Sequence, residues 1–287
     1  MTRYARPGTV EEALDLLGDG VWRILAGGTD FYPALGDRPV RSNILDVTAL
    51  PELRGIRETD SGFIFGATTR WTDIASATLP PAFEALRQAA REVGSIQVQN
   101  AGTLAGNLCN ASPAADGVPA LMVLDAAVEV RSRETTRHLG LSDFILGNRR
   151  TALRPGEIVT AVTVPKRAAN GRSAFVKLGA RRYLVISIAM VAARIVAAPD
   201  GTITDAAVAV GACSAVAQRL GFLEDALVGR SINADPGEAV HASDLAALTP
   251  IDDVRGSAEY RREAALEIVR RAVRAAAVGT AGRDIAA

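Results

Sequence analysis

The sequence is poor in the side chains that usually bind metals or form disulfides. It has two cysteines, Cys109 and Cys213, and two histidines, His138 and His241. Two thiols cannot build a disulfide framework, and they fall short of the four thiolates that hold an iron–sulfur cluster. The histidines lie far apart and match neither a metal-ligand spacing nor the order of a Ser-His-Asp triad. We therefore expect no metal site and no catalytic side chain of these kinds.

The chain also lacks an excess of charge and a long apolar run. Thirty-two basic side chains balance thirty-two acidic ones, so no overall field favours nucleic acid or an anionic membrane surface. The longest apolar stretch, residues 184–193, is far shorter than a membrane span. With 48% hydrophobic residues, the chain can bury a large core. We expect a folded cytoplasmic protein that neither binds nucleic acid nor spans a membrane.

Short helices and strands alternate through the first part of the chain. Thr9 and Glu12 occupy capping-box positions, which predicts a helix over 10–17. Strands over 21–25 and 42–47 flank a glycine-rich turn, which is typical of a small α/β unit with a parallel strand pair. The same patterns predict strands at 63–67, 127–130 and 158–164, a helix over 68–74 with Thr or Ser caps, a helix at 81–93 and a buried element at 121–124.

A linker-like stretch predicts a domain boundary. Residues 166–173 are polar and contain a glycine, and a proline precedes them. We place one domain at 1–170, with lobes of about 1–55 and 56–170, and a second domain at 171–287. For the second domain we expect strands over 173–177, 187–195 and 206–210 and helices over 220–228 and 257–278, the last with an apolar stripe opposite an arginine-rich face.

Two glycine-rich segments are candidates for binding a phosphate. Gly27 and Gly28 leave a short strand, and glycine lets backbone N–H groups approach phosphate oxygens closely; Thr29 adds a hydroxyl donor. The motif matches neither G-x-G-x-x-G nor a Walker A loop, and taken alone it is more typical of an ordinary turn. Residues 100–116 form the second segment, which we expect to be a long polar loop, either exposed or wrapped around a polar ligand.

Asp116 closes the second segment and has two interpretations. Its carboxylate is suited to accept hydrogen bonds from ribose hydroxyls beyond a phosphate-binding turn. It is equally suited to cap a helix that begins before Val118. Residue types alone leave both interpretations open.

Four segments, in order, carry a resemblance that covers nearly the whole chain. They are AGGTD at 26–30, GTLAGNLCNASPAAD at 102–116, FVKLGARR at 175–182 and DDVRGSAEYRREAALEIVRRAV at 252–273. Together they resemble the FAD-binding medium subunit of the xanthine dehydrogenase and carbon monoxide dehydrogenase family of molybdenum hydroxylases. The resemblance implies an α+β fold, with a two-lobed FAD-binding domain of the vanillyl-alcohol-oxidase (PCMH) type. A small C-terminal domain with a three-stranded antiparallel sheet and helices would follow it.

The resemblance also implies a set of cofactor contacts. The first glycine segment would bind the FAD diphosphate, the second would make further phosphate and ribityl contacts, and Asp116 would accept from a ribose hydroxyl. Lys177, one of only two lysines with Lys166, would be a flavin-contacting lysine. The full set of implied FAD contacts is Ile24, Leu25, Ala26, Gly27, Gly28, Thr29, Asp30, Phe31, Gly102, Thr103, Leu104, Ala105, Gly106, Asn107, Asp116, Ile158, Val159 and Lys177.

The implied function is electron transfer within a xanthine dehydrogenase-like oxidoreductase. A molybdopterin large subunit would carry the substrate chemistry, and a small subunit would carry the 2Fe-2S clusters. This chain would take electrons from the clusters and pass them to NAD⁺ or another acceptor, in a heterotrimer or a dimer of heterotrimers. Residues 183–186 depart from the acidic pair of many relatives, which leaves the acceptor open. The alternatives are a stand-alone flavin oxidoreductase and a non-catalytic nucleotide-binding module.

Overall fold

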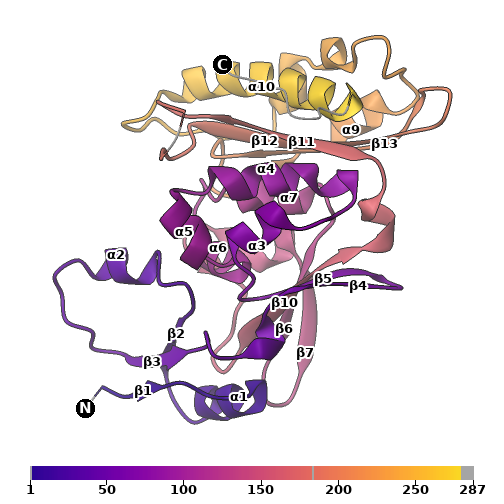
Figure 1. Cartoon of the computed structure of the whole chain (residues 1–287). Coiled ribbons are helices and arrows are strands. Elements are labelled where there is room, and N and C mark those ends of the chain that lie inside the picture. The colour runs from indigo at the N-terminus through magenta and orange to yellow at the C-terminus, as the bar shows by residue number, and fades with distance from the viewer. Residues whose placement is uncertain (1, 183, 279–287) are drawn as a thin grey trace.

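The structure is a computed structural model that describes residues 2–182 and 184–278. Met1, Tyr183 and residues 279–287 lie outside the described residues, and so does the end of the predicted second domain. The chain begins in a small lobe, continues through a larger helical and sheet region, and ends with a long helix over a second sheet (Figure 1).

The N-terminal lobe is the predicted α/β unit. Its elements are β1 (Tyr4–Ala5), α1 (Val10–Gly18), β2 (Trp22–Leu25), α2 (Phe31–Leu35) and β3 (Asn43–Asp46). The three strands are parallel in the order β1-β3-β2, so the expected parallel pair is confirmed and gains β1 at its edge. Thr9 Oγ1 accepts from the Glu12 N–H at 3.2 Å, and the Glu12 carboxylate accepts from the Gly8 N–H at 2.7 Å, which fixes the start of α1.

The second lobe is built on a five-stranded antiparallel sheet in the order β4-β5-β10-β6-β7. Its strands are β4 (Ile56–Thr59), β5 (Gly62–Gly66), β6 (Ala127–Arg131), β7 (Thr136–Gly140) and β10 (Ile158–Pro165), with the small ribbon β8 (Ile145–Gly147) and β9 (Arg150–Thr151) alongside. Its helices are α3 (Trp71–Ser76), α4 (Glu84–Glu92), α5 (Ile96–Ala101), α6 (Leu104–Asn110), α7 (Gly117–Met122) and α8 (Leu141–Phe144).

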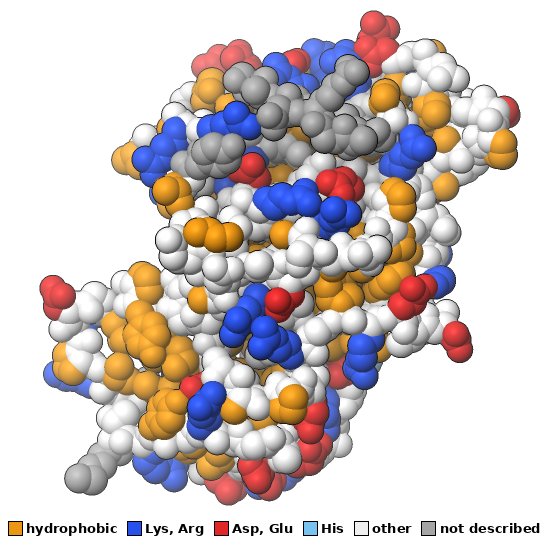
Figure 2. Space-filling model, in the orientation of Figure 1, with side chains coloured by type: hydrophobic (Ala, Val, Ile, Leu, Met, Phe, Trp, Pro, Cys, Tyr) orange, Lys and Arg blue, Asp and Glu red, His pale blue; other side chains and the backbone are white. Residues whose placement is uncertain are grey.

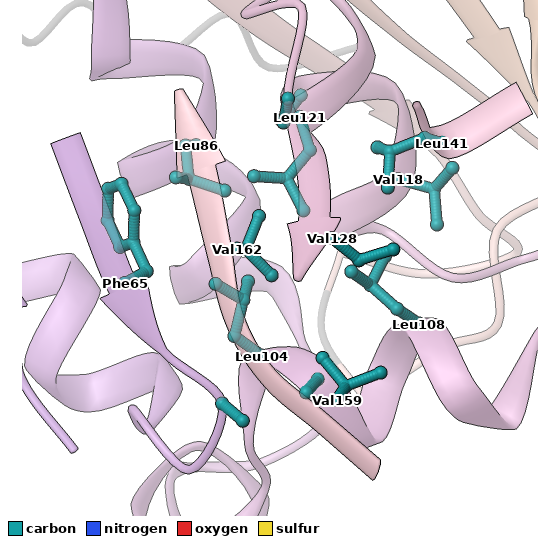
Figure 3. Packing of buried hydrophobic residues seen from close by; sticks show 14 of the residues in the cluster. Phe65, Leu86, Leu104, Leu108, Val118, Leu121, Val128, Leu141, Val159 and Val162 are labelled. Atoms are coloured by element: carbon teal, nitrogen blue, oxygen red, sulfur yellow. The ribbon is translucent and has the colours of Figure 1, made fainter. Parts of the chain in front are cut away.

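The helices of this lobe pack on its sheet through leucine and valine side chains. Leu104 and Leu108, one turn apart on α6, are fully buried beside Val159 and Val162 of β10 (Figure 3). Leu121 of α7 joins the same core. This packing holds α6 rigidly against the sheet, and α6 carries the second glycine segment.

Two expectations for this lobe are wrong. Residues 100–116 are mostly helical, because Ser95 caps α5 and Thr103 caps α6 while the leucines of α6 supply a buried face. The helix expected after Thr68 begins at Trp71, with Arg70 at its N-cap and Asp73 accepting from the Arg70 N–H. Thr68 does not cap it, since the Thr68 hydroxyl donates to the Leu53 carbonyl at 2.9 Å.

The C-terminal region is a sheet covered on both faces. Three long antiparallel strands, β11 (Arg172–Leu178), β12 (Ala189–Ala197) and β13 (Ile203–Gly211), match the expectation, and the short β14 (Gln218–Arg219) adds a fourth. The helix α10 (Ala258–Val278) lies along one face, while α4 and α7 of the second lobe lie along the other (Figure 1). The remaining helices are α9 (Gly221–Leu227) and the 3₁₀ turns Pro51–Leu53, Pro81–Phe83, Lys166–Ala169, Pro236–Ala239 and Ala242–Leu245.

Buried polar contacts tie this sheet to the second lobe. The Ser173 hydroxyl donates to the Ala82 carbonyl at 2.7 Å and accepts from the Ala85 N–H at 2.8 Å. Arg194, 2% exposed, donates from Nε to the Val123 carbonyl at 2.8 Å. No helix within residues 2–182 and 184–278 is long and apolar enough to cross a membrane.

Candidate cofactor site

The two glycine segments meet in space. A Cβ on Gly27 would lie 2.0 Å from the Ala101 carbonyl oxygen and 2.9 Å from the Gly102 Cα. A Cβ on Gly102 would lie 3.4 Å from the Thr29 hydroxyl oxygen. Gly27 is therefore required because the first loop packs directly on the backbone between α5 and α6. This contact joins the N-terminal lobe to the second lobe.

The first loop presents unused backbone donors. The N–H groups of Gly27, Gly28 and Thr29 donate to no other residue in the described part of the chain. Gly28 has a φ of +73°, a left-handed conformation that glycine adopts without strain. Consecutive N–H groups in such a turn form a concave site that suits an anion.

A cleft of about 840 Å³ runs along this junction. This volume lies within the range of small-molecule and cofactor pockets. Its walls are mostly apolar, with Val93, Val98, Ile158 and Val159 among them, and polar groups gather at the glycine segments. Figure 2 shows hydrophobic side chains gathered on the N-terminal lobe, with basic side chains beside them toward the middle of the molecule.

Most of the predicted contact residues line this cleft. The lining includes Ile24, Ala26, Gly27, Gly28, Thr29, Asp30, Phe31, Gly102, Thr103, Ala105, Gly106, Asn107, Ile158 and Val159. Leu25 and Leu104 are not in the lining but are buried in the hydrophobic core, 7% and 0% exposed. Their side chains therefore pack into the core and not into the cleft.

Asp116 and Lys177 pair with each other in the interface between the second lobe and the C-terminal sheet. The Lys177 Nζ lies 2.7 Å from Asp116 Oδ2, and both side chains are less than a tenth exposed. The Ser187 hydroxyl donates to the other carboxylate oxygen at 2.6 Å. Burial raises the pKa of the Asp116 carboxyl above its ordinary value, although the Lys177 charge and the Ser187 hydrogen bond act in the opposite direction. Asp116 stands at the N-cap of α7, but its side chain makes no capping hydrogen bond.

The cleft contains the predicted contact Asn107 and three residues outside the predicted contact set, Cys109, Asn110 and Arg149. The Asn107 Oδ1 is buried without a hydrogen-bond partner among the described residues and lies near Gly117 at the start of α7. The Cys109 side chain opens into the cleft, and desolvation by the surrounding walls raises the pKa of its thiol to about 12. Asn110 and Arg149 also line the cleft. Arg149 comes from the β8–β9 ribbon, which no local pattern connects to the glycine segments.

Comparison with known proteins decides the family. Residues 1–167 match the family model described as the FAD binding domain in molybdopterin dehydrogenase, and residues 174–276 match the CO dehydrogenase flavoprotein C-terminal domain. The chain belongs to the FAD-binding subunits of the molybdenum hydroxylase family. Its relatives are medium-chain FAD subunits of CO and xanthine dehydrogenase-type enzymes.

Individual relatives cover almost all of this FAD subunit. The nicotine 6-hydroxylase medium subunit of Paenarthrobacter nicotinovorans is 32% identical, with 94% of this chain and 95% of that protein covered. The carbon monoxide dehydrogenase medium chain of Afipia carboxidovorans is 31% identical, with 94% of each chain covered. A structure of reconstituted CO dehydrogenase from Oligotropha carboxidovorans superposes with a TM-score of 0.89 at 26% identity, covering 98% of this chain and 99% of that one.

The cleft residues fit FAD. The unused N–H groups of the first loop and the Thr29 hydroxyl suit a diphosphate, and the apolar walls suit flat rings. Asn107 and the Thr103 residue that caps α6 add polar groups to the lining beside the first loop. The described residues contain no cluster of three or more side chains that could hold a metal ion.

Proposed function

We propose that this chain is the electron-delivering subunit of a three-subunit molybdenum hydroxylase. It would accept electrons from the iron–sulfur clusters of a small subunit and pass them to NAD⁺ or another acceptor, while a molybdopterin subunit carries the substrate chemistry. Bound FAD supplies the exchange between one-electron and two-electron transfer. The observation that carries the proposal is the meeting of the two glycine segments at an apolar cleft in a chain of this family. A cytoplasmic location stays a prediction.

The chain's own residues would bind and orient the cofactor. We propose that the N–H groups of Gly27, Gly28 and Thr29 bind the diphosphate, and that Thr103 and Asn107 contact the adjoining part of the cofactor. Ile158 and Val159 would pack against a ring. For Asp116 and Lys177 we propose contacts at the ribose and flavin, for which their buried pair would have to open toward the cleft.

We place the domain division at 170/171, and the two family matches support it, since one stops at 167 and the other starts at 174.

A stand-alone flavin oxidoreductase would need a substrate-binding cap over the flavin. The C-terminal sheet is poorly placed to serve as one, because α10 covers one of its faces and α4 and α7 cover the other. A nucleotide-binding module without redox function would not need the family's C-terminal domain.

Gly27→Ala tests the site. Its Cβ would collide with the Ala101 carbonyl, so the two segments would separate and the FAD cradle would open. We expect the variant, purified without flavin, to bind FAD at least tenfold more weakly than the wild type in a fluorescence titration. The matched control is Gly221→Ala, where the new Cβ meets nothing within 4 Å. Wild-type protein that binds no FAD, or Gly27→Ala protein that binds it normally, would contradict the proposed site.

A further inference from the structure

The cleft holds few charged groups for an anionic cofactor. Arg23 and Arg149 are the cations in its lining, and Asp30 is the carboxylate. A diphosphate carries negative charge that neutral N–H and hydroxyl donors leave unbalanced, and a guanidinium is well matched to phosphate oxygens in shape and charge. The charge partner of the diphosphate should therefore be one of these two arginines.

Arg149 is held at the mouth of the cleft by its backbone. It stands in the turn between β8 and β9 with a φ of 57°, a conformation that is uncommon for a residue with a side chain. Its N–H donates to the Ala111 carbonyl at 2.8 Å, directly after α6. This bond fixes the turn against the end of the helix that carries the second glycine segment.

The side chain of Arg149 reaches into the polar part of the cleft without a carboxylate partner. Its Nη1 donates to the Asn110 side-chain oxygen, and lies 3.4 Å from the Asn110 backbone oxygen. No carboxylate of residues 2–182 and 184–278 forms a salt bridge with it. Its charge is thus available to a ligand.

Asn110 connects this arginine to the first glycine segment. The Asn110 amide donates from Nδ2 to Asp30 Oδ1 at 2.7 Å, and Asp30 directly follows Thr29. A chain of three side chains, Asp30, Asn110 and Arg149, therefore bridges the N-terminal lobe, the end of α6 and the β8–β9 ribbon beside the proposed diphosphate site. Arg23, in contrast, lies over the Phe31 ring with its Cζ 4.4 Å from the ring centroid.

We infer that Arg149 is the charge partner of the FAD diphosphate and that Asn110, held by Asp30, positions it. This inference rests on the proposed diphosphate site at Gly27–Thr29 and adds a residue from a separate hairpin to it. It makes the site selective for flavins that carry the diphosphate over riboflavin, which has no phosphate.

The test compares FAD and riboflavin binding to flavin-free protein by flavin fluorescence, at low and high salt. Arg149→Gln should raise the FAD dissociation constant by roughly 10- to 100-fold, the effect of losing a charge-assisted hydrogen bond, and leave riboflavin binding unchanged. It should also flatten the salt dependence of FAD binding, since that dependence reports charge pairing. Arg149→Lys should restore much of the salt dependence.

The neighbouring arginine is the matched control. Arg150 donates to the Leu146 carbonyl at 3.1 Å and does not line the cleft, so Arg150→Gln should bind FAD as the wild type does. Unchanged FAD affinity and salt dependence in Arg149→Gln would overturn the inference while leaving the proposed function intact. Equal weakening of FAD and riboflavin, or loss of the salt dependence in Arg23→Gln instead, would also overturn it. A wild type that binds no FAD would contradict the proposed function itself.

Discussion

At the scale of single residues, the two glycines of the first segment have different tasks. Gly28 supplies a left-handed backbone conformation, while Gly27 leaves room for the Ala101–Gly102 backbone. The sequence alone offers a phosphate site or an ordinary turn for both glycines. It does not reveal the contact of Gly27 with the Ala101–Gly102 backbone, because a contact between segments about seventy residues apart leaves no local pattern. The pairing of Asp116 with Lys177 is equally non-local, although the rarity of lysine in the chain singled out Lys177.

The chain's two lysines allow a matched test of the buried pair. Lys177→Met leaves the Asp116 carboxylate buried without its cation, so we expect the free energy of unfolding at pH 7 to fall by about 3–5 kcal/mol. Lys166 pairs with Glu58 at the surface, where both side chains are more than half exposed, and Lys166→Met should cost about 1 kcal/mol or less. Urea unfolding of the two variants measures the difference, and equal losses would contradict the role of the buried pair.

The same variant has a predicted pH dependence. Burial raises the pKa of the Asp116 carboxyl, and removing Lys177 takes away an opposing charge, so in Lys177→Met the pKa should rise further. A carboxyl with a raised folded-state pKa favours the folded state at low pH and loses that contribution as pH rises through this pKa. The destabilisation by Lys177→Met should therefore be larger at pH 8 than at pH 5. A destabilisation that is larger at pH 5 would contradict this.

At the scale of elements, strands and long helices were predictable and the short helices of the second glycine segment were not. The helix over 10–17 and the last helix appear at Val10–Gly18 and Ala258–Val278, because caps and apolar periodicity mark them. The helices α5 and α6 have only six and seven residues, and α6 contains one Gly and two Asn, which disfavour helices in isolation. Tertiary packing of Leu104 and Leu108 overrides that preference in α6.

The ion pair of Arg137 and Glu157 links β7 to the turn before β10. It makes the stability of the second lobe depend on pH. Burial of Glu157 opposes its ionisation, but hydrogen bonds from Arg137 and from the Arg154 N–H outweigh burial and hold the pKa of Glu157 below its ordinary value. A carboxyl with a lowered folded-state pKa stabilises the fold above its ordinary pKa, and this contribution is lost as pH falls through the folded-state value.

Glu157→Gln should therefore lower the free energy of unfolding at pH 7 by about 1–3 kcal/mol, because the Arg137 pair is lost. The difference from the wild type should shrink between pH 5 and pH 3, as the wild-type carboxyl becomes protonated. Urea unfolding across this range measures it, with Glu259→Gln on the exposed first turn of α10 as control. A difference that stays constant down to pH 3 would show that ionisation of Glu157 does not stabilise the lobe.

At the scale of the whole molecule, the cleft exists because the N-terminal lobe packs against the second lobe. The N-terminal lobe contributes the first glycine segment to the cleft, and the second lobe contributes α6 and β10. The C-terminal sheet packs on α4 and α7 of the second lobe (Figure 1). The four resemblance-bearing segments predicted the family and the fold class. Arg149 and Asn110 could not be predicted as a pair, because only the folding of the second lobe brings the β8–β9 ribbon to the end of α6.

The most direct test of the central claim is a crystal structure of this chain with bound FAD. The account predicts that diphosphate oxygens lie within hydrogen-bonding distance of the N–H groups of Gly28 and Thr29, between the two glycine segments. A structure with FAD bound elsewhere, while these N–H groups still have no partner, would contradict the account.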